Sequence, residues 1–552
     1  MRSNRLSFTV LMTLALTVGV FATPQVKAPS RQQAPGKREK PALVSPVDAR
    51  LEVLKRDLAA EIDGMQSLTQ QMVDMLFSFA EPGFQEFETK KYCTQILRNN
   101  GFEIEENVAG MPTGWTARWG SGKPVIALGS DVDSLLGTSQ KPGVPYHEPF
   151  IEGAPGHGEG HNTGIPLSIT AALALKNVME RGKIAGTIVV WPGIAEELLG
   201  GKAQFARAGV FKDVDVCLFS HIASAMGVSW GDASGTGAVS VEYTFTGQSA
   251  HAAGAPWQGR SALDAVELMD VGWNFRREHL RLSQRSHYVI TDGGGQPNVV
   301  PPAASVWYYF REIDYPHIKE MWELGNTMAD GATMMTGTKV TSRLLGSAWP
   351  QHMNKTVAET MYANIQKVGM PQWSEADQAF AKLVQRNMKV REQGLQTAVG
   401  KLEGPTPPED NRGGGSDDIG DVSWSVPTVT LRYPGNIPGM TGHHWSSAIA
   451  EATPVAHKGV TTGAKVEAAT AIDFLMKPEL VQQAWDYFRN VQNKQATYKP
   501  FPGEKDKPAT WLNEKLMQQI RPEMKKFYYD PAKYKTYLEQ LGIAYPPPGA
   551  VK

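Results

Sequence analysis

The segment His157-Gly-Glu-Gly-His161 places three side chains that can bind a metal ion within five residues. Its two glycines allow the backbone to turn tightly, which brings the imidazoles and the carboxylate together. Borderline-soft ions such as Zn²⁺ and Mn²⁺ accept both imidazole and carboxylate ligands. The segment therefore predicts part of a metal site, and the alternative is a surface loop that is simply rich in Gly and His.

The pair Glu196-Glu197 has residue types that suit metal-assisted hydrolysis. One carboxylate can bind a metal while the other removes a proton from a water molecule that the metal has made more acidic. Adjacent acids are also common on solvated helix ends. The pair alone does not decide between these two interpretations, so its position in the fold matters.

Several short apolar runs predict the strands that would position these residues. They lie at 125–129, 187–191, 214–219 and 428–432, and helical patterns such as 165–178 separate them. Alternation of strands and helices predicts an α/β fold with a mainly parallel sheet and helices on both faces.

Polar residues of metal-binding type follow each predicted strand. They are Asp131 and Asp133, Glu196 and Glu197, His221, and, after a loop rich in Gly and Pro, His443-His444. The carboxyl ends of parallel strands meet at one edge of a sheet, where ligands bind in open α/β folds. We therefore expect one shared site, with Asp131 and Asp133 orienting the metal ligands through hydrogen bonds. His221 taken alone would equally be a structural histidine.

The sequence pattern changes after residue 236. Val239, Val241, Tyr243 and Phe245 alternate with polar residues, which predicts a strand with one buried face. The predicted order up to residue 346 is β-α-β-β-α-β, a ferredoxin-like insert. We therefore expect a catalytic domain in two parts, at 50–235 and 347–476, with the insert between them at 236–346. A C-terminal extension of short helices would follow at 477–552.

The N-terminus has the pattern of a secretory signal peptide. Arg2 and Arg5 precede an almost wholly apolar stretch from Leu6 to Phe21, and small residues follow it. We predict a signal peptide at 1–28, a linker at 29–49, and a protein exported to the periplasm or secreted. An N-terminal membrane anchor is the alternative, although the apolar run is shorter than a usual span.

The overall composition limits the partners and the redox chemistry. Lys and Arg number 55 and Asp and Glu number 56, which argues against nucleic acid or a membrane as the main partner. Only Cys93 and Cys217 are present, far apart in sequence. We interpret both as buried apolar residues rather than as a disulfide or a catalytic thiol.

In combination, the motifs resemble the amidohydrolases of metallopeptidase family 20, the aminoacylase and carboxypeptidase relatives. The resemblance covers about residues 65–475 and is strongest to the p-aminobenzoyl-glutamate hydrolase branch. The motifs that carry it are Ser130-Asp-Val-Asp133, Gly156-His-Gly-Glu-Gly-His-Asn162, Pro192-Gly-Ile-Ala-Glu-Glu197, Ser249-Ala-His-Ala-Ala253, Gly259-Arg-Ser-Ala-Leu-Asp264, Pro297-Asn-Val-Val-Pro301 and Gly442-His-His-Trp445. The resemblance implies a metallohydrolase domain that is interrupted by a lid and dimerisation domain.

The resemblance also implies a role for each matching residue. Glu196 would be the general base, and His157 would support the metal loop. His251 of the lid would reach the active site of the partner subunit and steady the oxyanion, while Asn298 would contact the substrate. The metal ligands would be Glu159, His161, Glu197, His221 and His443.

Glu159 departs from this branch, which commonly has Cys at that position. The exchange replaces a soft ligand with a hard one and should shift preference from Zn²⁺ towards Mn²⁺ or a similar ion. We expect one or two divalent ions, Mn²⁺ or Zn²⁺, in a homodimer formed through the lid.

The function that these expectations support is hydrolysis of the amide bond of an N-acyl or aryl amino acid or a short peptide. Glu196 would take a proton from the metal-activated water, and His251 would help to stabilise the oxyanion. The alternatives are a dipeptidase of the same family and a non-catalytic relative that binds a metal or a ligand.

Overall fold

In the computed structural model, residues 46–232, 235–407, 409–411 and 413–550 are described. The predicted signal peptide and nearly all of the predicted linker lie outside these residues. The linker prediction overlaps the first helix, because α1 (Pro46–Gly64) begins at residue 46. Within the described residues, no helix has both the length and the apolar character needed to cross a membrane.

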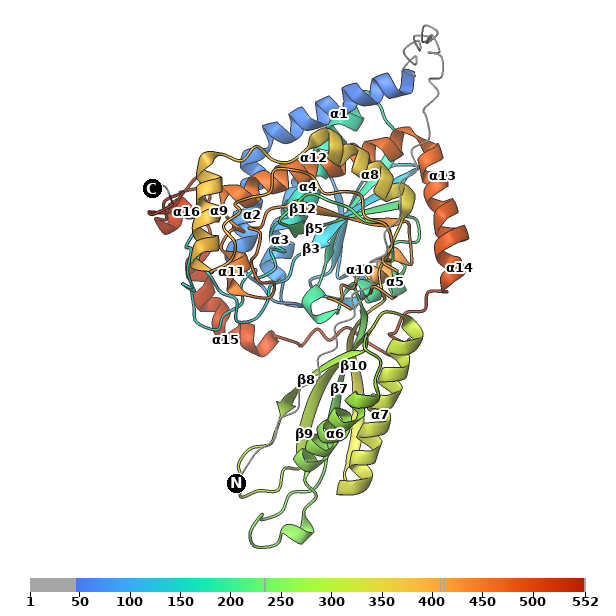
Figure 1. Ribbon diagram of the computed structural model, residues 1–552, viewed down its shortest axis with the longest axis vertical. Helices are drawn as coiled ribbons and strands as arrows, with labels where there is room; N and C mark the ends of the chain where they lie inside the picture. Colours follow the sequence, from blue (N-terminus) through green and yellow to red (C-terminus); the bar gives the residue numbers. More distant parts are fainter. Residues whose placement is uncertain (1–45, 233–234, 408, 412, 551–552) are drawn as a thin grey trace, which may run out of the picture. The chain divides into compact units, whose positions relative to one another are not determined.

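A six-stranded sheet forms the centre of the larger domain (Figure 1), with the order β1-β2-β4-β3-β5-β12. The strands β4 (Gly186–Gly193), β3 (Val125–Asp131), β5 (Val216–Ala223) and β12 (Thr428–Pro434) run parallel to one another. At one end of the sheet, β1 (Glu103–Glu106) pairs antiparallel with β2 (Trp115–Ser121), and β2 pairs antiparallel with β4. The predicted mainly parallel α/β sheet is therefore confirmed.

Burial on both faces explains why the sequences of these strands are continuous apolar runs. Every residue of β3 and β4 is buried, as expected for strands that are covered on both faces. Helix α4 (Gly164–Gly182) packs against β3, β4 and β5, and α12 (Pro454–Met476) packs against α4 and β12. Cys93 and Cys217 are buried and unpaired in this region, as predicted.

The remaining helices of the larger domain surround this core. They are α2 (Gln66–Phe79), α3 (Phe87–Asn99), α5 (Lys202–Ala208), α8 (Lys355–Val368), α9 (Glu375–Asn387), α10 (Ile419–Ser423) and α11 (Trp445–Ala448). A short sheet pairs β6 (Gly231–Asp232) with β11 (His352–Met353).

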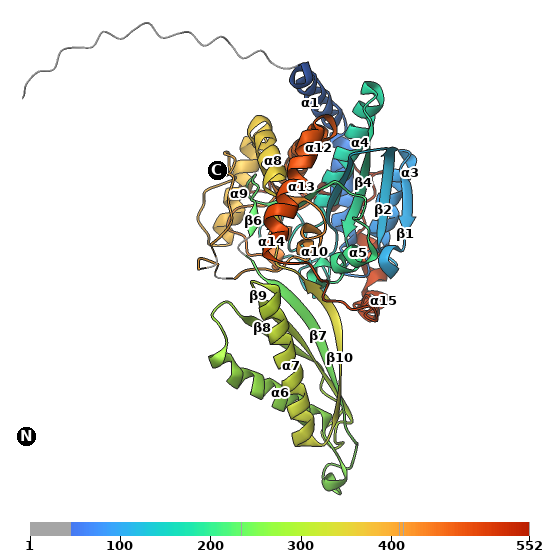
Figure 2. The same cartoon turned by 90° about the vertical axis from the view of Figure 1, so that its right-hand side faces the viewer.

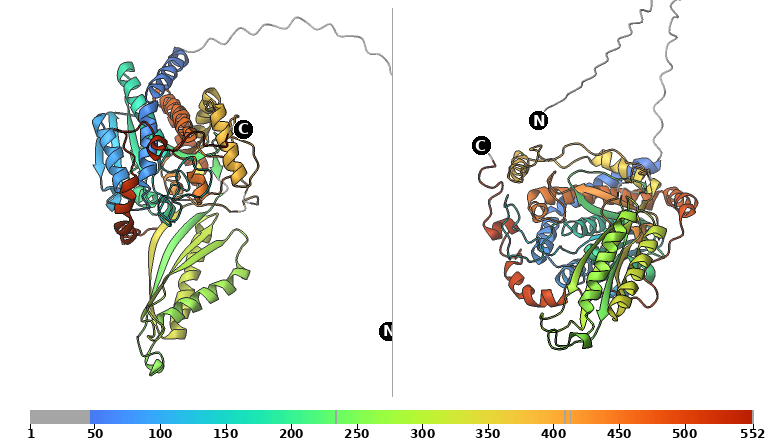
Figure 3. Two further views of the ribbon diagram at one scale, coloured as in Figure 1. Left: turned by 90° about the vertical axis from the view of Figure 1, so that its left-hand side faces the viewer. Right: turned by 60° about the horizontal axis from the view of Figure 1, so that its bottom comes forward.

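The insert forms a separate antiparallel sheet with the order β10-β7-β9-β8. Its elements follow the predicted β-α-β-β-α-β order: β7 (Gly237–Thr246), α6 (Ala262–Arg276), β8 (Arg285–Asp292), β9 (Ala303–Glu312), α7 (Tyr315–Thr336) and β10 (Lys339–Ala348). Helices α6 and α7 pack against each other and against this sheet (Figures 2 and 3). We call residues 237–348 the lid.

Side-chain caps mark the starts of the two lid helices. Ser261 accepts a hydrogen bond from the backbone nitrogen of Asp264 at the start of α6 (3.1 Å), and Asp314 accepts one from His317 at the start of α7 (3.0 Å). Val239, Val241, Tyr243 and Phe245 of β7 are buried against these helices. The alternation in the sequence therefore corresponds to a strand that packs one face against the lid helices.

The C-terminal extension forms short helices, α13 (Pro478–Tyr487), α14 (Asn493–Gln495), α15 (Glu514–Met524) and α16 (Tyr537–Leu541). It contacts the larger domain through buried polar groups: Arg521 pairs with Glu81, and the backbone nitrogen of Tyr537 donates to Asp74 (2.9 Å). These contacts tie the extension to α2 and to the segment that follows it.

Candidate metal centre and active site

The predicted site residues gather at the carboxyl ends of the parallel strands. Asp131 is the last residue of β3, and His221 lies near the end of β5. Glu196 and Glu197 form a short 3-10 turn that follows β4. His161 precedes α4, and His443 follows β12. The residues expected at the strand ends thus lie at one edge of the sheet.

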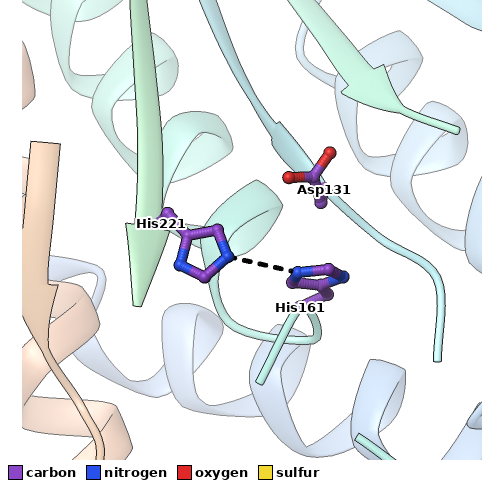
Figure 4. Close-up of side chains that lie close together, drawn as sticks. All are labelled: Asp131, His161 and His221. Atoms are coloured by element: carbon purple, nitrogen blue, oxygen red, sulfur yellow. Dashed lines mark hydrogen bonds between the residues drawn. The ribbon is translucent and has the colours of Figure 1, made fainter. Parts of the chain in front are cut away.

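Two buried histidines face each other at the centre of this group (Figure 4). The Nε2 atoms of His161 and His221 lie 3.4 Å apart. Each Nδ1 lies against a backbone carbonyl, of Asp133 for His161 (3.2 Å) and of Ile222 for His221 (2.9 Å). Because a carbonyl oxygen can only accept, each Nδ1 carries a proton, and the two facing Nε2 atoms are the nitrogens that a metal ion could bind in place of a proton. A metal ion is the natural partner of such a pair.

Glu159 and His443 extend the cluster on the other side. Glu159 Oε2 lies 2.8 Å from His443 Nε2, and Glu159 Oε1 lies 3.8 Å from His221 Nε2. His443 Nε2 is also 3.6 Å from Glu197 Oε2. Glu197 Oε1 is buried and, among the described residues, accepts no hydrogen bond. The structure thus brings all five predicted ligands together, and their nitrogen and oxygen donors fit a divalent ion.

The electrostatics of the cluster also fit a bound cation. Burial raises the pKa of Glu197 to about 8, and the nearby Glu159 and Asp133 add to this effect while His161 opposes it. Burial and the charges of Asp417 and Asp131 hold the pKa of Glu196 well above its usual range. A divalent cation would relieve this crowding of acids, as expected where carboxylates converge on a metal.

The turn that carries Glu196 and Glu197 is held by two buried acids. Asp133 accepts hydrogen bonds from the backbone nitrogens of both residues, each at 3.1 Å. Glu86 accepts one from the nitrogen of Ala195 (2.9 Å), whose φ of +52° is unfavourable for a residue with a side chain. Strained backbone persists only when its surroundings hold it in place, and such strain is frequent at active sites. Asp133 therefore lies where it can orient the Glu196-Glu197 turn.

The metal loop depends on one glycine and on a histidine that turns away from the cluster. Gly160 has a φ of +76°, and a Cβ there would lie 2.8 Å from the buried carboxylate of Glu451. His157 Nε2 lies 3.1 Å from the backbone oxygen of Leu76 in α2, so His157 holds the loop to that helix. This placement agrees with a supporting position for His157 rather than with metal binding.

The two lid residues of the prediction lie elsewhere. His251 and Asn298 occupy adjoining exposed segments, joined by a hydrogen bond from the nitrogen of Ala252 to the oxygen of Asn298 (3.0 Å). Neither side chain lines the cavity at the metal cluster. His251 Nδ1 accepts a hydrogen bond from the nitrogen of Gly254 (2.9 Å), which leaves Nε2 as the ring nitrogen that carries the proton. A single subunit does not bring these residues to the cluster.

A cavity of about 720 Å³ opens next to the metal cluster. Glu159, Glu196 and Glu197 lie at one side, and the lid contributes Arg285, His287 and Arg311. Arg285 of β8 and Arg311 of β9 are direct cross-strand neighbours. Like charges in that arrangement destabilise a sheet, so a ligand with negative charge would stabilise it.

Sequence reasoning missed this basic wall and a second group of charged residues. Lys202, Asp417 and Asp418 form a buried cluster beside Glu196. Asp417-Asp418 closely follows the glycine-rich run 413–415, and this pair of adjacent acids after a glycine-rich loop could have marked them as candidate site residues. Lys202, Arg285 and Arg311 stand in ordinary helix and strand patterns and carry no such signal.

One pattern in the sequence has the form Gly-x-Ser-x-Gly, at Gly227-Val-Ser-Trp-Gly231. That pattern marks a serine nucleophile when the serine sits on a sharp turn from a strand to a helix. Here the segment is irregular and leads from β5 into the short strand β6. The structure therefore gives no support for a serine nucleophile at Ser229.

Known proteins that are similar to this chain include a hydrolase and a dipeptidase. Residues 235–329 match the family described as the peptidase dimerisation domain. One of the p-aminobenzoyl-glutamate hydrolase subunits of Escherichia coli is 32% identical over 453 residues, which cover 78% of this chain and 94% of that protein. Xaa-Arg dipeptidase of Mus musculus is 28% identical over 452 residues, 79% of this chain and 92% of the dipeptidase.

A solved structure shares the fold. The crystal structure of a protein described as an aminohydrolase from methicillin-resistant Staphylococcus aureus aligns with a TM-score of 0.52 at 18% identity. The alignment covers 76% of this chain and 100% of that one. The two chains therefore share their overall fold.

Proposed function

Since the chain belongs to metallopeptidase family 20 and is a metal-dependent hydrolase of amide bonds, we propose that Glu196 is its general base. We further propose that Glu159, His161, Glu197, His221 and His443 bind one or two divalent ions. The observation that carries this assignment is the close approach of the Nε2 atoms of His161 and His221 beside two glutamates.

A bound divalent ion polarises the scissile carbonyl and lowers the pKa of a water molecule. Glu196 lies within 4.8 Å of donor atoms of His161 and Glu197, so its carboxylate is at hand to take the proton from that water. A raised pKa makes a carboxylate a stronger base, which suits this task. The protonated Glu196 would then pass the proton to the leaving nitrogen.

The basic wall of the cavity favours a substrate with more than one carboxylate. In the described part of the chain, neither Arg285 nor Arg311 forms an ion pair with a carboxylate, and Arg311 Nε is buried without a hydrogen-bond partner. Burial and the neighbouring arginines, Arg311 among them, lower the pKa of His287. These groups match an N-acyl or N-aroyl derivative of glutamate or aspartate better than a substrate that ends in arginine, because the lid wall would repel a guanidinium.

The lid is proposed to pair two copies of the chain and to deliver His251 to the partner's cavity. The match to the peptidase dimerisation domain supports this pairing. The edge strand β8 and helix α6 also expose Phe275 (75%), Val289 (57%) and Ile290 (47%). Such apolar side chains on a strand edge and its neighbouring helix are typical of a subunit contact. Asn298, which is next to His251, would then contact the substrate.

Two further proposals concern the metal and the place of action. The donor set contains no sulfur, because Glu159 is the residue beside His443, and this favours Mn²⁺ over Zn²⁺. The basic start and the apolar run Leu6–Phe21 support export through a signal peptide to the periplasm or beyond.

The experiment that tests the function is a substrate panel on metal-depleted protein. N-benzoyl-glutamate, N-benzoyl-leucine and N-benzoyl-arginine would each be offered with added Mn²⁺ or Zn²⁺. We expect metal-dependent hydrolysis that is fastest for the glutamate derivative. Protein that binds metal but hydrolyses none of the three would favour a non-catalytic relative, and a preference for arginine would overturn the assignment of the basic wall.

A further inference from the structure

A lysine is completely buried between the metal cluster and the proposed base. Lys202 is the first residue of α5, and its side chain has no exposed surface. Its Nζ lies 2.6 Å from Asp131 Oδ1, 2.5 Å from Asp418 Oδ1 and 3.2 Å from Asp417 Oδ1. An unpaired buried charge is very unfavourable, so this ammonium is retained only because three carboxylates surround it.

The three carboxylates reach different parts of the active site. A carboxylate oxygen of Asp131 lies within 4.8 Å of ring nitrogens of His161 and His221. Asp417 lines the cavity and, with Asp418, lies within 4.8 Å of a carboxylate oxygen of Glu196. Through these aspartates, the Lys202 ammonium is linked both to the histidine ligands and to the proposed general base.

The surrounding backbone holds this arrangement rigidly. Asp418 Oδ2 accepts hydrogen bonds from the backbone nitrogens of Lys202 (2.9 Å) and Gly201 (3.3 Å). Asp417 Oδ1 accepts one from Ile419 (2.8 Å). Gly193 leaves the room that the pair needs, because a Cβ there would lie 1.9 Å from Asp131 Oδ1. The cluster thus has a fixed geometry as well as a balance of charge.

The charges explain why a cation is needed at this point. Asp131, Asp417 and Asp418 lie close to Glu196, and Lys202 is the one cation that contacts all three aspartates among the described residues. Burial opposes the charge on Lys202, but the three aspartates and Glu196 outweigh it and hold its pKa well above its usual range. Without the ammonium, the carboxylates would repel one another and move apart.

We infer that Lys202 is a positioning residue for both halves of the active site. It holds Asp131 against the histidine ligands and Asp417 beside Glu196, so that the metal cluster and the base keep their relative places. This inference rests on the proposed function, since it assigns Lys202 to a metal centre and to a general base. Groups that orient metal ligands from behind typically change metal affinity by about 10–100-fold when they are removed.

The test is Lys202→Met, which keeps most of the side-chain volume and removes the charge. Mn²⁺ affinity would be measured by titration calorimetry on metal-depleted protein, and kcat and KM would be measured with N-benzoyl-glutamate. We expect Mn²⁺ affinity to fall about tenfold or more and kcat to fall at least as much, with KM changed by less than about threefold.

A matched control is Lys55→Met. Lys55 of α1 is also mostly buried, and its Nζ lies 2.6 Å from Asp473 Oδ2 of α12, but it does not line the catalytic cavity. This control variant should lose thermal stability while it keeps wild-type Mn²⁺ affinity and kcat. The comparison distinguishes a general loss of stability from a displacement of the metal ligands and Glu196.

If Lys202→Met does not fold, Lys202→Met combined with Asp418→Asn removes one acid together with the cation and leaves Asp131 and Asp417 without their partner. A folded variant of either kind that retains wild-type Mn²⁺ affinity and kcat would overturn the inference and leave Lys202 a purely structural residue. The calorimetric result does not depend on turnover, so failure of this inference can be distinguished from failure of the proposed function.

Discussion

The strand-end cluster and the lid loop that carries His251 contain the same types of residue in opposite settings. His161 and His221 are 4% and 9% exposed and lie in contact with other candidate ligands, whereas His251 is exposed and away from the cavity. The first group is assembled by the parallel sheet of one chain. Among the described residues of the same chain, His251 does not meet the candidate metal ligands or Glu196. One chain therefore assembles the metal cluster, whereas two copies would be needed to bring His251 to it.

Metal removal should affect the strand-end cluster most strongly. A chelator is expected to abolish hydrolysis of N-benzoyl-glutamate and to lower Tm, because a ligand present at a hundred times its Kd stabilises the folded state by about 2.7 kcal/mol. Added Mn²⁺ should restore both activity and Tm. Full activity after exhaustive dialysis against chelator, with metal absent by elemental analysis, would show that the cluster is not a catalytic centre.

The lid loop is tested by complementation between subunits. His251→Ala should lower kcat by about 10²–10³-fold, the usual cost of losing one oxyanion donor. Mixing it with a Glu196→Gln variant and allowing subunits to exchange should restore about a quarter of wild-type activity, since half of the dimers would then contain one intact site. Mixtures that stay as inactive as either variant alone would show that His251 acts within its own subunit or not at all.

The basic wall should affect substrate choice more than the rate of the chemical step. Arg311→Ala and Arg285→Ala should each raise KM for N-benzoyl-glutamate by about 10–100-fold, the usual worth of a hydrogen bond to a charged group. KM for N-benzoyl-leucine serves as the internal control and should rise less, because that substrate has one carboxylate fewer. Equal effects on both substrates would mean that the arginines recognise only the shared carboxylate.

A change at Glu159 should have the smallest of these effects, on the metal preference of the strand-end cluster. Glu159→Cys introduces a soft ligand into the donor set and should raise affinity for Zn²⁺ relative to Mn²⁺ by about tenfold. Competition calorimetry with the two ions measures this ratio directly. An unchanged ratio would indicate that Glu159 bonds to His443 without contributing to metal choice.

The sheet and the strand-end residues were predictable because their signals are local. A buried parallel strand reads as a continuous apolar run, and the polar residue that follows it must lie at the sheet edge. For this reason Asp131, Glu196 and His221 could be placed together before their distances were known. The alternation in β7 likewise identified the insert, because a strand with one buried face repeats every two residues.

The remaining features depend on contacts between distant segments. Lys202 begins an ordinary helix, and its partners Asp417 and Asp418 are more than two hundred residues away in sequence. The pairing of Arg285 with Arg311 depends on the register of β8 and β9, which the composition of either strand does not reveal. His157 has the residue type of a metal ligand, yet its contact with Leu76 turns it away from the cluster.

The central claim is that Glu196 is the base at a metal centre formed by its neighbours. Its most direct test is Glu196→Gln, examined both by kinetics with N-benzoyl-glutamate and by Mn²⁺ calorimetry. The structure predicts that kcat falls by about 10²–10⁴-fold, as expected for loss of a general base, while Mn²⁺ affinity stays within about threefold of wild type. A variant that retains most of its turnover with Mn²⁺ bound would contradict the assignment of Glu196 as the base.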